Sequence, residues 1–221
     1  MQNTAMLLVE GEGDRLFFAE FLKRIPLAVD VQPDTPKNVA HKIYRNGVNT
    51  LLTRLNFEIV RLIRGELGKL AVVLDADQSP DFGFQNRRNK VESILANHGF
   101  NSGAVPALQR EGEVFTHVSG AEVGLWIMPD HFSDGLFENF LLPTIAASGQ
   151  ALLQTAQTTV SGLGGQQLFK PIHQPKAELA TWLAWQKEPG ISPSYAYSQD
   201  LFDKQHPNLI ALSTWLTRVF K

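Results

Sequence analysis

The sequence predicts a single α/β domain over residues 1–221, in which a mostly parallel central sheet is flanked by helices. Short apolar runs at Ala5–Val9 and Leu70–Leu74 read as buried strands, and amphipathic helical patterns alternate with them. With 221 residues, of which 43% are hydrophobic, the chain can bury one sizeable core. Residues 190–221 are expected to form a C-terminal helical extension of this domain.

The first part of the chain predicts one half of a βαβ unit. The strand Ala5–Val9 is followed by a Gly-containing turn and by a helix that begins near Asp14 and ends at Pro26. We expect a second short strand at Leu27–Val31. The pattern then predicts mostly helix over residues 37–68, a central strand at Leu70–Leu74 and a helix from Asn86 to Asn97.

The second part of the chain continues the alternation of strands and helices. The pattern predicts strands at Gly103–Leu108 and Val123–Met128, and helices at Gly135–Ile145, Lys176–Gln186 and the C-terminal segment. Residues 146–170 are small and polar and are assigned no regular element. We expect Trp182 and Trp185 to pack in a core.

Charge and composition exclude several classes of function. The formal net charge is -2, so any contact with nucleic acid must be local, because binders that rely on overall charge are strongly basic. The absence of cysteine excludes disulfides, thiolate zinc sites and cysteine nucleophiles, and it fits a reducing cytoplasm. The N-terminal apolar run is too short for a signal peptide or a membrane span, so we expect a cytoplasmic protein without membrane association.

Carboxylates follow both of the clearest strands at the point where each strand ends. Glu10 follows Val9, and Asp75 and Asp77 follow Leu74. Alternation along an extended chain would place Asp75 and Asp77 on the same side. If the two strands are neighbours, Glu10, Asp75 and Asp77 converge, and a divalent cation would relieve their repulsion. Oxygen-only ligands favour Mg²⁺ or Mn²⁺.

The order of these motifs resembles that of Toprim domains. MLLVEGEGDRLFF, followed later by LAVVLDADQSP, is similar to a Glu after one apolar strand and an Asp-x-Asp after another. Toprim domains occur in primases, topoisomerases, ribosomal-RNA-maturing ribonucleases and OLD (overcoming lysogenization defect) nucleases. GLWIMPD, GLFENFL and KAELATWLAWQ also resemble an uncharacterised group of stand-alone bacterial Toprim-like proteins. Glu10 and Asp75 are 65 residues apart, so an insertion between the strands is expected.

The resemblance implies a Mg²⁺-dependent phosphoryl-transfer site. Glu10 would act as a general acid/base or a metal ligand, and Asp75 and Asp77 would be metal ligands. Asp14 matches a second acid that follows the first Glu in OLD-like nucleases, and it is alternatively a helix cap. Glu138 is either a further acid of the metal site or a first-turn partner of the helix dipole.

Basic residues near these acids are candidates for phosphate contacts. Half of the Lys and Arg residues, 10 of 20, fall between Lys37 and Lys90. Arg87, Arg88 and Lys90 could hold phosphates beside the metal, or they form an ordinary solvated helix face. Lys176 is either a surface lysine or, as the OLD resemblance implies, a lysine that stabilises transition-state charge.

Two classes of function follow from these patterns. The first is a metal-dependent nuclease that acts on DNA or RNA through Glu10, Asp75 and Asp77. The second is a non-catalytic module that binds metal, a nucleotide or nucleic acid within a defence or repair complex. The expected partner is nucleic acid or another phosphate-containing ligand, while the oligomeric state is not indicated by the sequence.

Overall fold

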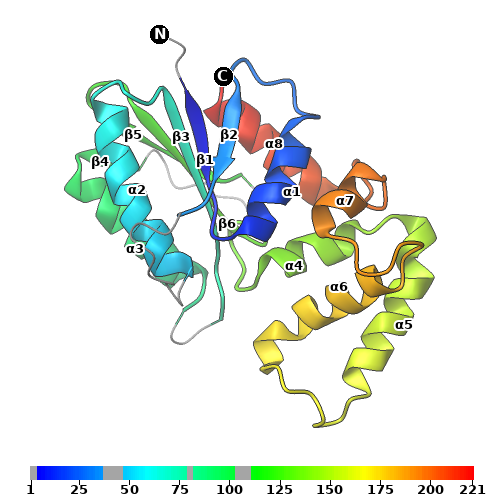
Figure 1. The fold of residues 1–221 in the computed structure, drawn as a ribbon. Coiled ribbons are helices and arrows are strands. Elements are labelled where there is room, and N and C mark those ends of the chain that lie inside the picture. The colour runs from blue at the N-terminus through cyan, green and yellow to red at the C-terminus, as the bar shows by residue number, and fades with distance from the viewer. Residues whose placement is uncertain (1–3, 37–46, 79–81, 103–110) are drawn as a thin grey trace.

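The computed structural model of the chain describes residues 4–36, 47–78, 82–102 and 111–221, and it has the predicted α/β fold. Its sheet has six strands in the order β2-β1-β3-β6-β5-β4 (Figure 1). The pairs β1–β2, β1–β3 and β3–β6 are parallel, while β5 is antiparallel to both β6 and β4. The strands are β1 (Ala5–Leu8), β2 (Val31–Asp34), β3 (Lys69–Asp75), β4 (Phe100–Ser102), β5 (Glu113–His117) and β6 (Glu122–Met128).

Helices cover both faces of the sheet. Side chains alternate along the central strands, so that Val72 and Leu74 face one hydrophobic cluster and Ala71 and Val73 face the other. Burial on both faces explains why the central strands are continuous apolar runs. The helices are α1 (Glu12–Leu22), α2 (Gly47–Ile63), α3 (Phe84–Asn97), α4 (Phe137–Leu141), α5 (Gln150–Ser161), α6 (Gln174–Ala184), α7 (Pro193–Ser198) and α8 (Pro207–Val219).

The C-terminal helices pack back onto the domain. The Tyr197 ring of α7 lies 5.4 Å from the ring of Phe17 in α1. Helix α8 approaches β6 so closely that a Cβ atom at Gly124 would lie 2.6 Å from Cγ2 of Val219. Residues 190–221 therefore complete the core on one face of the sheet.

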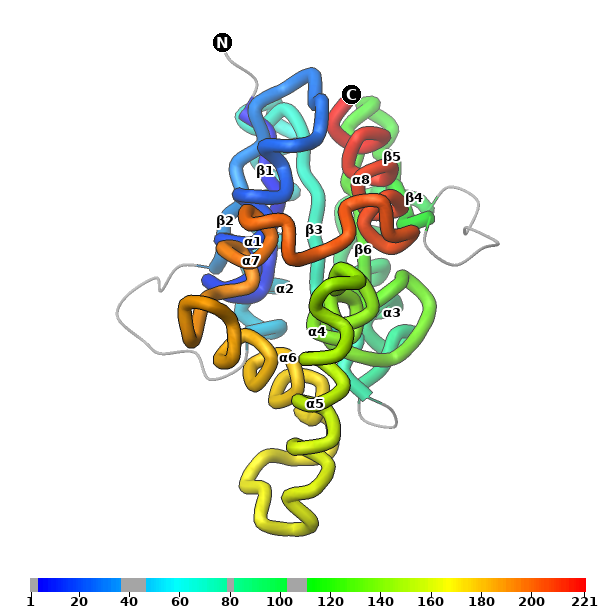
Figure 2. The backbone as a smooth tube through the Cα atoms, turned by 90° about the vertical axis from the view of Figure 1, so that its right-hand side faces the viewer, coloured from blue at the N-terminus to red at the C-terminus, as the bar shows by residue number. Residues whose placement is uncertain are grey.

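Helices α5 and α6 form a hairpin, called here the arm, that projects beyond the carboxyl ends of the parallel strands (Figures 1 and 2). A 3-10 turn, η3 (Pro171–His173), leads directly into α6. Trp182 is buried at the base of the arm and donates from Nε1 to the carbonyl of Gly149 at 3.3 Å, as a core residue should. Trp185 was also predicted to be a core residue, but it is 41% exposed.

Several predicted elements differ from the observed ones. The second strand lies at Val31–Asp34, not Leu27–Val31, and it tolerates Pro33 because it is an edge strand that needs fewer backbone donors. Helix α5 was missed within residues 146–170, because only Leu153, Ala156 and Val160 mark its buried face. The predicted strand at 103–108 and the helical positions 37–46 lie outside the described residues.

No helix in the described ranges is both long enough and apolar enough to cross a membrane.

Candidate functional site

Strands β1 and β3 are neighbours in the sheet, and their pairing brings two of the candidate acids together. Strands β1 and β3 are paired in parallel, with Leu8 opposite Val72, so their carboxyl ends lie at the same edge of the sheet. Glu10 follows β1, and its Oε1 accepts the backbone N–H of Asp75 at 2.8 Å. A backbone contact thus ties the carboxylate of Glu10 to the end of β3.

The side chains of Asp75 and Asp14 are held by backbone donors of two helix N-termini. Asp75 Oδ1 accepts the N–H of Phe137, the first residue of α4, at 2.8 Å. Asp14 Oδ2 accepts the N–H of Gly11, the N-cap of α1, at 3.0 Å. Asp14 therefore fulfils the capping role that its sequence position suggested, although it does so from the third residue of the helix.

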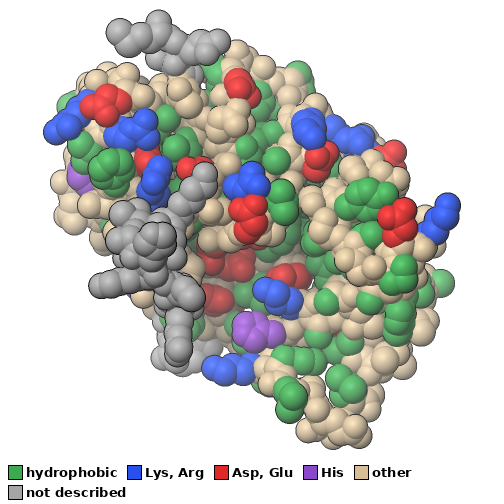
Figure 3. Space-filling view, in the orientation of Figure 1, with side chains coloured by type: hydrophobic (Ala, Val, Ile, Leu, Met, Phe, Trp, Pro, Cys, Tyr) green, Lys and Arg blue, Asp and Glu red, His purple; other side chains and the backbone are tan. Residues whose placement is uncertain are grey.

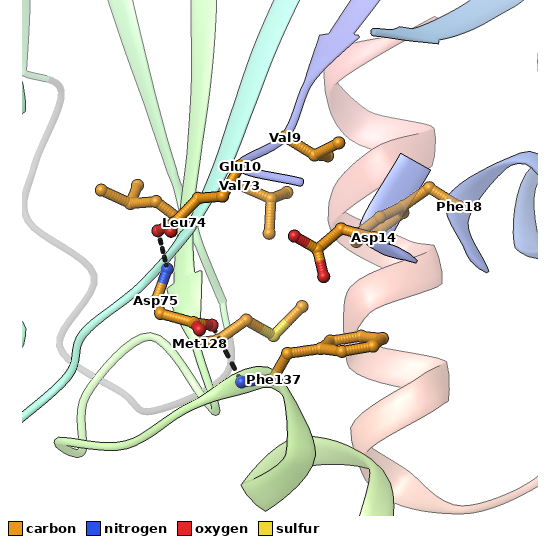
Figure 4. A pocket seen from close by; sticks show the side chains of 9 residues that line it. All are labelled: Val9, Glu10, Asp14, Phe18, Val73, Leu74, Asp75, Met128 and Phe137. Carbon is orange, nitrogen blue, oxygen red and sulfur yellow. Dashed lines mark hydrogen bonds between the residues drawn. The ribbon is translucent and has the colours of Figure 1, made fainter. Parts of the chain in front are cut away.

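Glu10, Asp14 and Asp75 line one small cavity. Its remaining wall is mainly apolar and includes Phe18 and Met128, and its volume of about 10 Å³ is on the scale of one water-sized particle. Figure 4 shows the carboxylates of Asp14 and Asp75 extending toward each other across this space. The space is large enough for one small ion or water and is too small for an organic cofactor.

Burial and the charges of neighbouring acids raise the pKa of all three carboxyl groups. Burial is the main cause for Glu10, whose pKa rises to about 7 with further contributions from the charges of Asp14 and Asp77. Burial, followed by the charge of Glu138, raises the pKa of Asp14 to about 6. Burial and then the charges of Glu10 and Asp14 raise the pKa of Asp75 well above its ordinary range. The fold therefore disfavours the ionised form of all three carboxyl groups when no cation is bound.

Asp77 does not line this cavity. Its backbone leaves the extended conformation (φ 61°) and forms an isolated bridge with Gly135, so the alternation that would place it beside Asp75 does not apply. Its carboxylate is ion-paired with the buried guanidinium of Arg87, which also lies 4.6 Å from the ring centroid of Phe82. The charge of Asp77 nevertheless raises the pKa of Glu10 and of Asp75.

Glu138 and Lys176 lie at the side of the site that faces the arm. Lys176 Nζ is 3.8 Å from Glu138 Oε1, and the lysine side chain is 68% exposed. The charge of Glu138 raises the pKa of Asp14 and of Asp75, whereas the charge of Lys176 lowers that of Asp14. Both residues are therefore close enough to the cavity for their charges to change the pKa of its acids.

The structure separates the other basic candidates from the cavity. Arg88 is buried and donates from Nε and Nη2 to the two carboxylate oxygens of Glu113 at 2.7 and 2.8 Å. Its guanidinium is thereby committed to an internal ion pair, so a phosphate-binding role for Arg88 does not fit this structure. Lys90 is exposed on α3, as expected for a solvated helix face.

Glu113 is the centre of a buried polar network that sequence reasoning missed. His131 Nε2 lies 2.9 Å from Glu113 Oε1, and Trp215 Nε1 donates to the backbone carbonyl of Glu113 at 3.2 Å. Burial raises the pKa of Glu113, but hydrogen bonds from His131 and Arg88 outweigh it and lower that pKa to about 2. No spacing in the sequence links these positions, because tertiary contacts alone bring them together.

Two further acids have local structural roles. Asp130 accepts the N–H of Ser133 at 2.7 Å and stabilises its own turn. Asp134 Oδ1 accepts the N–H of Phe84, the first residue of α3, at 2.8 Å. It therefore caps α3 from across the fold.

The donor set of the cavity fits a hard divalent cation. Glu10, Asp14 and Asp75 offer only oxygen atoms, which Mg²⁺ and Mn²⁺ prefer. Within the described ranges, none of these three carboxylates forms an ion pair, whereas Asp77 and Glu138 do. In the same ranges no three acidic or histidine side chains are already arranged as a coordination group. Side-chain rotation would therefore be needed to direct the oxygens at one ion.

Comparison with known proteins gives a match over nearly the whole chain. The family model described as "Protein of unknown function (DUF3226)" matches residues 4–221. No curated protein and no solved structure matches the chain.

Proposed function

The chain belongs to the DUF3226 family, whose description assigns no function, and we propose from its site that it is a divalent-metal-dependent phosphoryl-transfer protein, a nuclease that acts on DNA or RNA. One observation carries this proposal. Glu10, Asp14 and Asp75 gather around one small cavity at the carboxyl ends of neighbouring parallel strands, and none of them is ion-paired with a described residue. Ligands of open α/β sheets bind at this edge.

A bound metal ion would explain why the fold keeps these acids together. Buried carboxylates that repel one another cost stability unless a cation compensates them. The resemblance to Toprim domains supports the same interpretation, because Glu10 and Asp75 occupy the positions of that pattern's acids. Mg²⁺ or Mn²⁺ is the cation that this oxygen-only set would hold, with Asp77 contributing charge from its loop.

The residues of the site would divide the chemical work among them. When bound, the divalent ion would neutralise a phosphate and favour attack by water. Asp14 and Asp75 would supply oxygen ligands. Glu10 would either supply a further ligand or accept the proton of the attacking water at Oε2, because Oε1 already accepts the N–H of Asp75. Lys176, 3.8 Å from Glu138, would stabilise negative charge on the phosphate.

A second candidate function is a non-catalytic module that binds metal and a nucleotide or nucleic acid within a defence or repair complex. The observation that favours it is the formal net charge of -2, which gives the chain no overall attraction for a long nucleic-acid substrate. A module of this kind would bind Mg²⁺ or a phosphate ligand without forming a product.

A cleavage assay separates the two functions. We expect the purified protein to cut single- or double-stranded DNA or RNA in the presence of Mg²⁺ or Mn²⁺ and to lose all activity in EDTA, since the acids alone repel phosphate. Readdition of the metal should restore cleavage. Calorimetric Mg²⁺ binding with no product from any of these substrates would instead identify the non-catalytic module.

A further inference from the structure

The arm carries positive charge in a chain whose net charge is -2. Between residues 150 and 184 the arm contains two lysines, Lys170 and Lys176, and one acid, Glu178. All of these positions are described by the structure, and both lysines are exposed. The exposed charged side chains of the arm are therefore lysines, although the whole chain has a negative net charge.

The single acid of this segment faces inward. Glu178 is 7% exposed, and its two oxygens accept amide N–H groups of Gln157 at 3.2 Å and Gln174 at 2.8 Å. Its charge is thus withdrawn from the surface into the contact between α5 and α6. The outer side of η3 and of the first turn of α6 presents lysine and histidine without a neighbouring carboxylate of the arm.

Three of the exposed groups recur at intervals of three residues and lead toward the acids. Lys170 directly precedes η3, His173 ends it and Lys176 lies in the first turn of α6, where residues three apart lie near one face. The last of them reaches the site, since Lys176 Nζ lies 3.8 Å from Glu138. Figure 3 shows acidic side chains in a hollow, with Lys or Arg and His side chains next to it.

We propose that Lys170, His173 and Lys176 form a track that binds the phosphate backbone of a nucleic-acid strand entering the acidic cavity. The substrate is then a polynucleotide and not a small phosphate compound. This inference rests on the proposed function, because it assumes that phosphoryl transfer takes place at the acids of the cavity. Phosphate contacts of this kind position a strand without reading its sequence.

The length of the track sets the length of strand that it can bind. From Lys170 to Lys176 the chain advances by roughly 9–12 Å, at about 1.5–2.0 Å per residue in helical turns. A nucleic-acid strand in a helix advances by about 3.4 Å per phosphate, so the track spans roughly three nucleotides beyond the reacting phosphate.

Salt-dependent binding tests this track. Anisotropy of labelled DNA and RNA strands of about twelve nucleotides is measured with Mg²⁺ in the Asp75→Asn background, in which cleavage is expected to be slow. For Lys170→Ala, the slope of log affinity against log salt should become shallower by about 0.7, the value for one lost phosphate contact on a single strand. Lys187→Ala removes the same charge beyond the far end of α6 and should leave the slope unchanged.

The outcomes separate this inference from the proposed function. Equal slopes for Lys170→Ala, Lys187→Ala and the Asp75→Asn parent would overturn the track, and so would the absence of strand binding. If the track is overturned but the protein with native Asp75 still cleaves the strands, the nuclease assignment remains supported. Binding that depends on Lys170, together with no cleavage of the same strands in Mg²⁺ or Mn²⁺, would support the track and remove the nuclease activity.

Discussion

Replacement of Asp75 with Asn is expected to lower metal-dependent cleavage by at least about a hundredfold while leaving the metal-free protein as stable as before or more stable. Metal-assisted charge stabilisation is worth several kcal/mol, and each 1.4 kcal/mol corresponds to about a tenfold change in rate. Asn keeps an oxygen that can accept the N–H of Phe137, which Asp75 Oδ1 accepts at 2.8 Å. The substitution therefore removes charge with little change of geometry.

The expected gain in stability distinguishes a functional acid from a structural one. Burial and the charges of Glu10 and Asp14 raise the pKa of Asp75 well above its ordinary range, so its ionised form is disfavoured in the folded state. Removing that charge relieves the repulsion. For a chain of this size each kcal/mol gained would raise Tm by about 2–4 °C, which thermal unfolding in EDTA would measure.

Glu122→Gln is the matched control for Asp75→Asn. Glu122 begins β6, so it lies at the amino ends of the parallel strands, at the other end of β6 from the cavity. Its side chain is 39% exposed and lies 3.8 Å from Lys69. We expect unchanged cleavage and a change in stability below about 1 kcal/mol, as for a surface ion pair. Cleavage that survives in Asp75→Asn at the level of this control would remove Asp75 from the site.

Stabilisation by Mg²⁺ is expected to be large at pH 8 and absent at pH 5. At a concentration of about 100 times its Kd, a ligand that binds only the folded state adds about 2.7 kcal/mol. That gain would raise Tm by roughly 5–10 °C. At pH 5 the protons held by Glu10, with its pKa of about 7, and by Asp14, with its pKa of about 6, compete with the metal.

The same carboxyl groups set the pH dependence of the metal-free protein. The pKa of Glu10 is about 7 in the fold against an ordinary 4.5, and that of Asp14 is about 6 against 3.8. Between these values the folded state binds more protons than the unfolded state. The contribution of these two groups to stability is therefore largest below about pH 4, falls by up to about 1.4 kcal/mol per pH unit for each group as pH rises, and levels off above about pH 7.

Urea unfolding with and without Mg²⁺ across this pH range would measure both effects. The double variant Glu10→Gln, Asp14→Asn keeps acceptor oxygens for the N–H groups of Asp75 and Gly11. It should flatten the decline between pH 4 and pH 7 and lose the Mg²⁺ effect. Equal stabilisation by Mg²⁺ at pH 5 and pH 8, or an unaltered decline in the double variant, would contradict the raised pKa values.

The part of the fold that the sequence predicted well is the part governed by local pattern. Leu70–Leu74 and Val123–Met128 are continuous apolar runs, and both are central strands that are buried on two faces. Short antiparallel strands such as Phe100–Ser102 and Glu113–His117 carry no such run, since pairing with a neighbour stabilises them more than their own composition does. Their assignment required the tertiary structure.

In the candidate site, too, the features set by local pattern were predictable and those set by tertiary contacts were not. The neighbourhood of Glu10 and Asp75 followed from strand ends in a parallel sheet, and the structure places the two residues in contact. The position of Asp77 could not be predicted by alternation, because its positive φ depends on the bridge to Gly135. Arg88 looked like a phosphate ligand only because its partner, Glu113, lies 25 residues away in the sequence.

The most direct test of the central claim is to locate Mn²⁺ by anomalous diffraction in crystals grown near pH 8. We expect one ion in the cavity between Glu10, Asp14 and Asp75, with oxygen atoms of Asp75 and of at least one of the other two at roughly 2.0–2.6 Å. Side chains would turn inward to reach it. Carboxylates that keep their metal-free positions at saturating Mn²⁺, with no anomalous peak between them, would contradict the assignment of this cavity as a metal site.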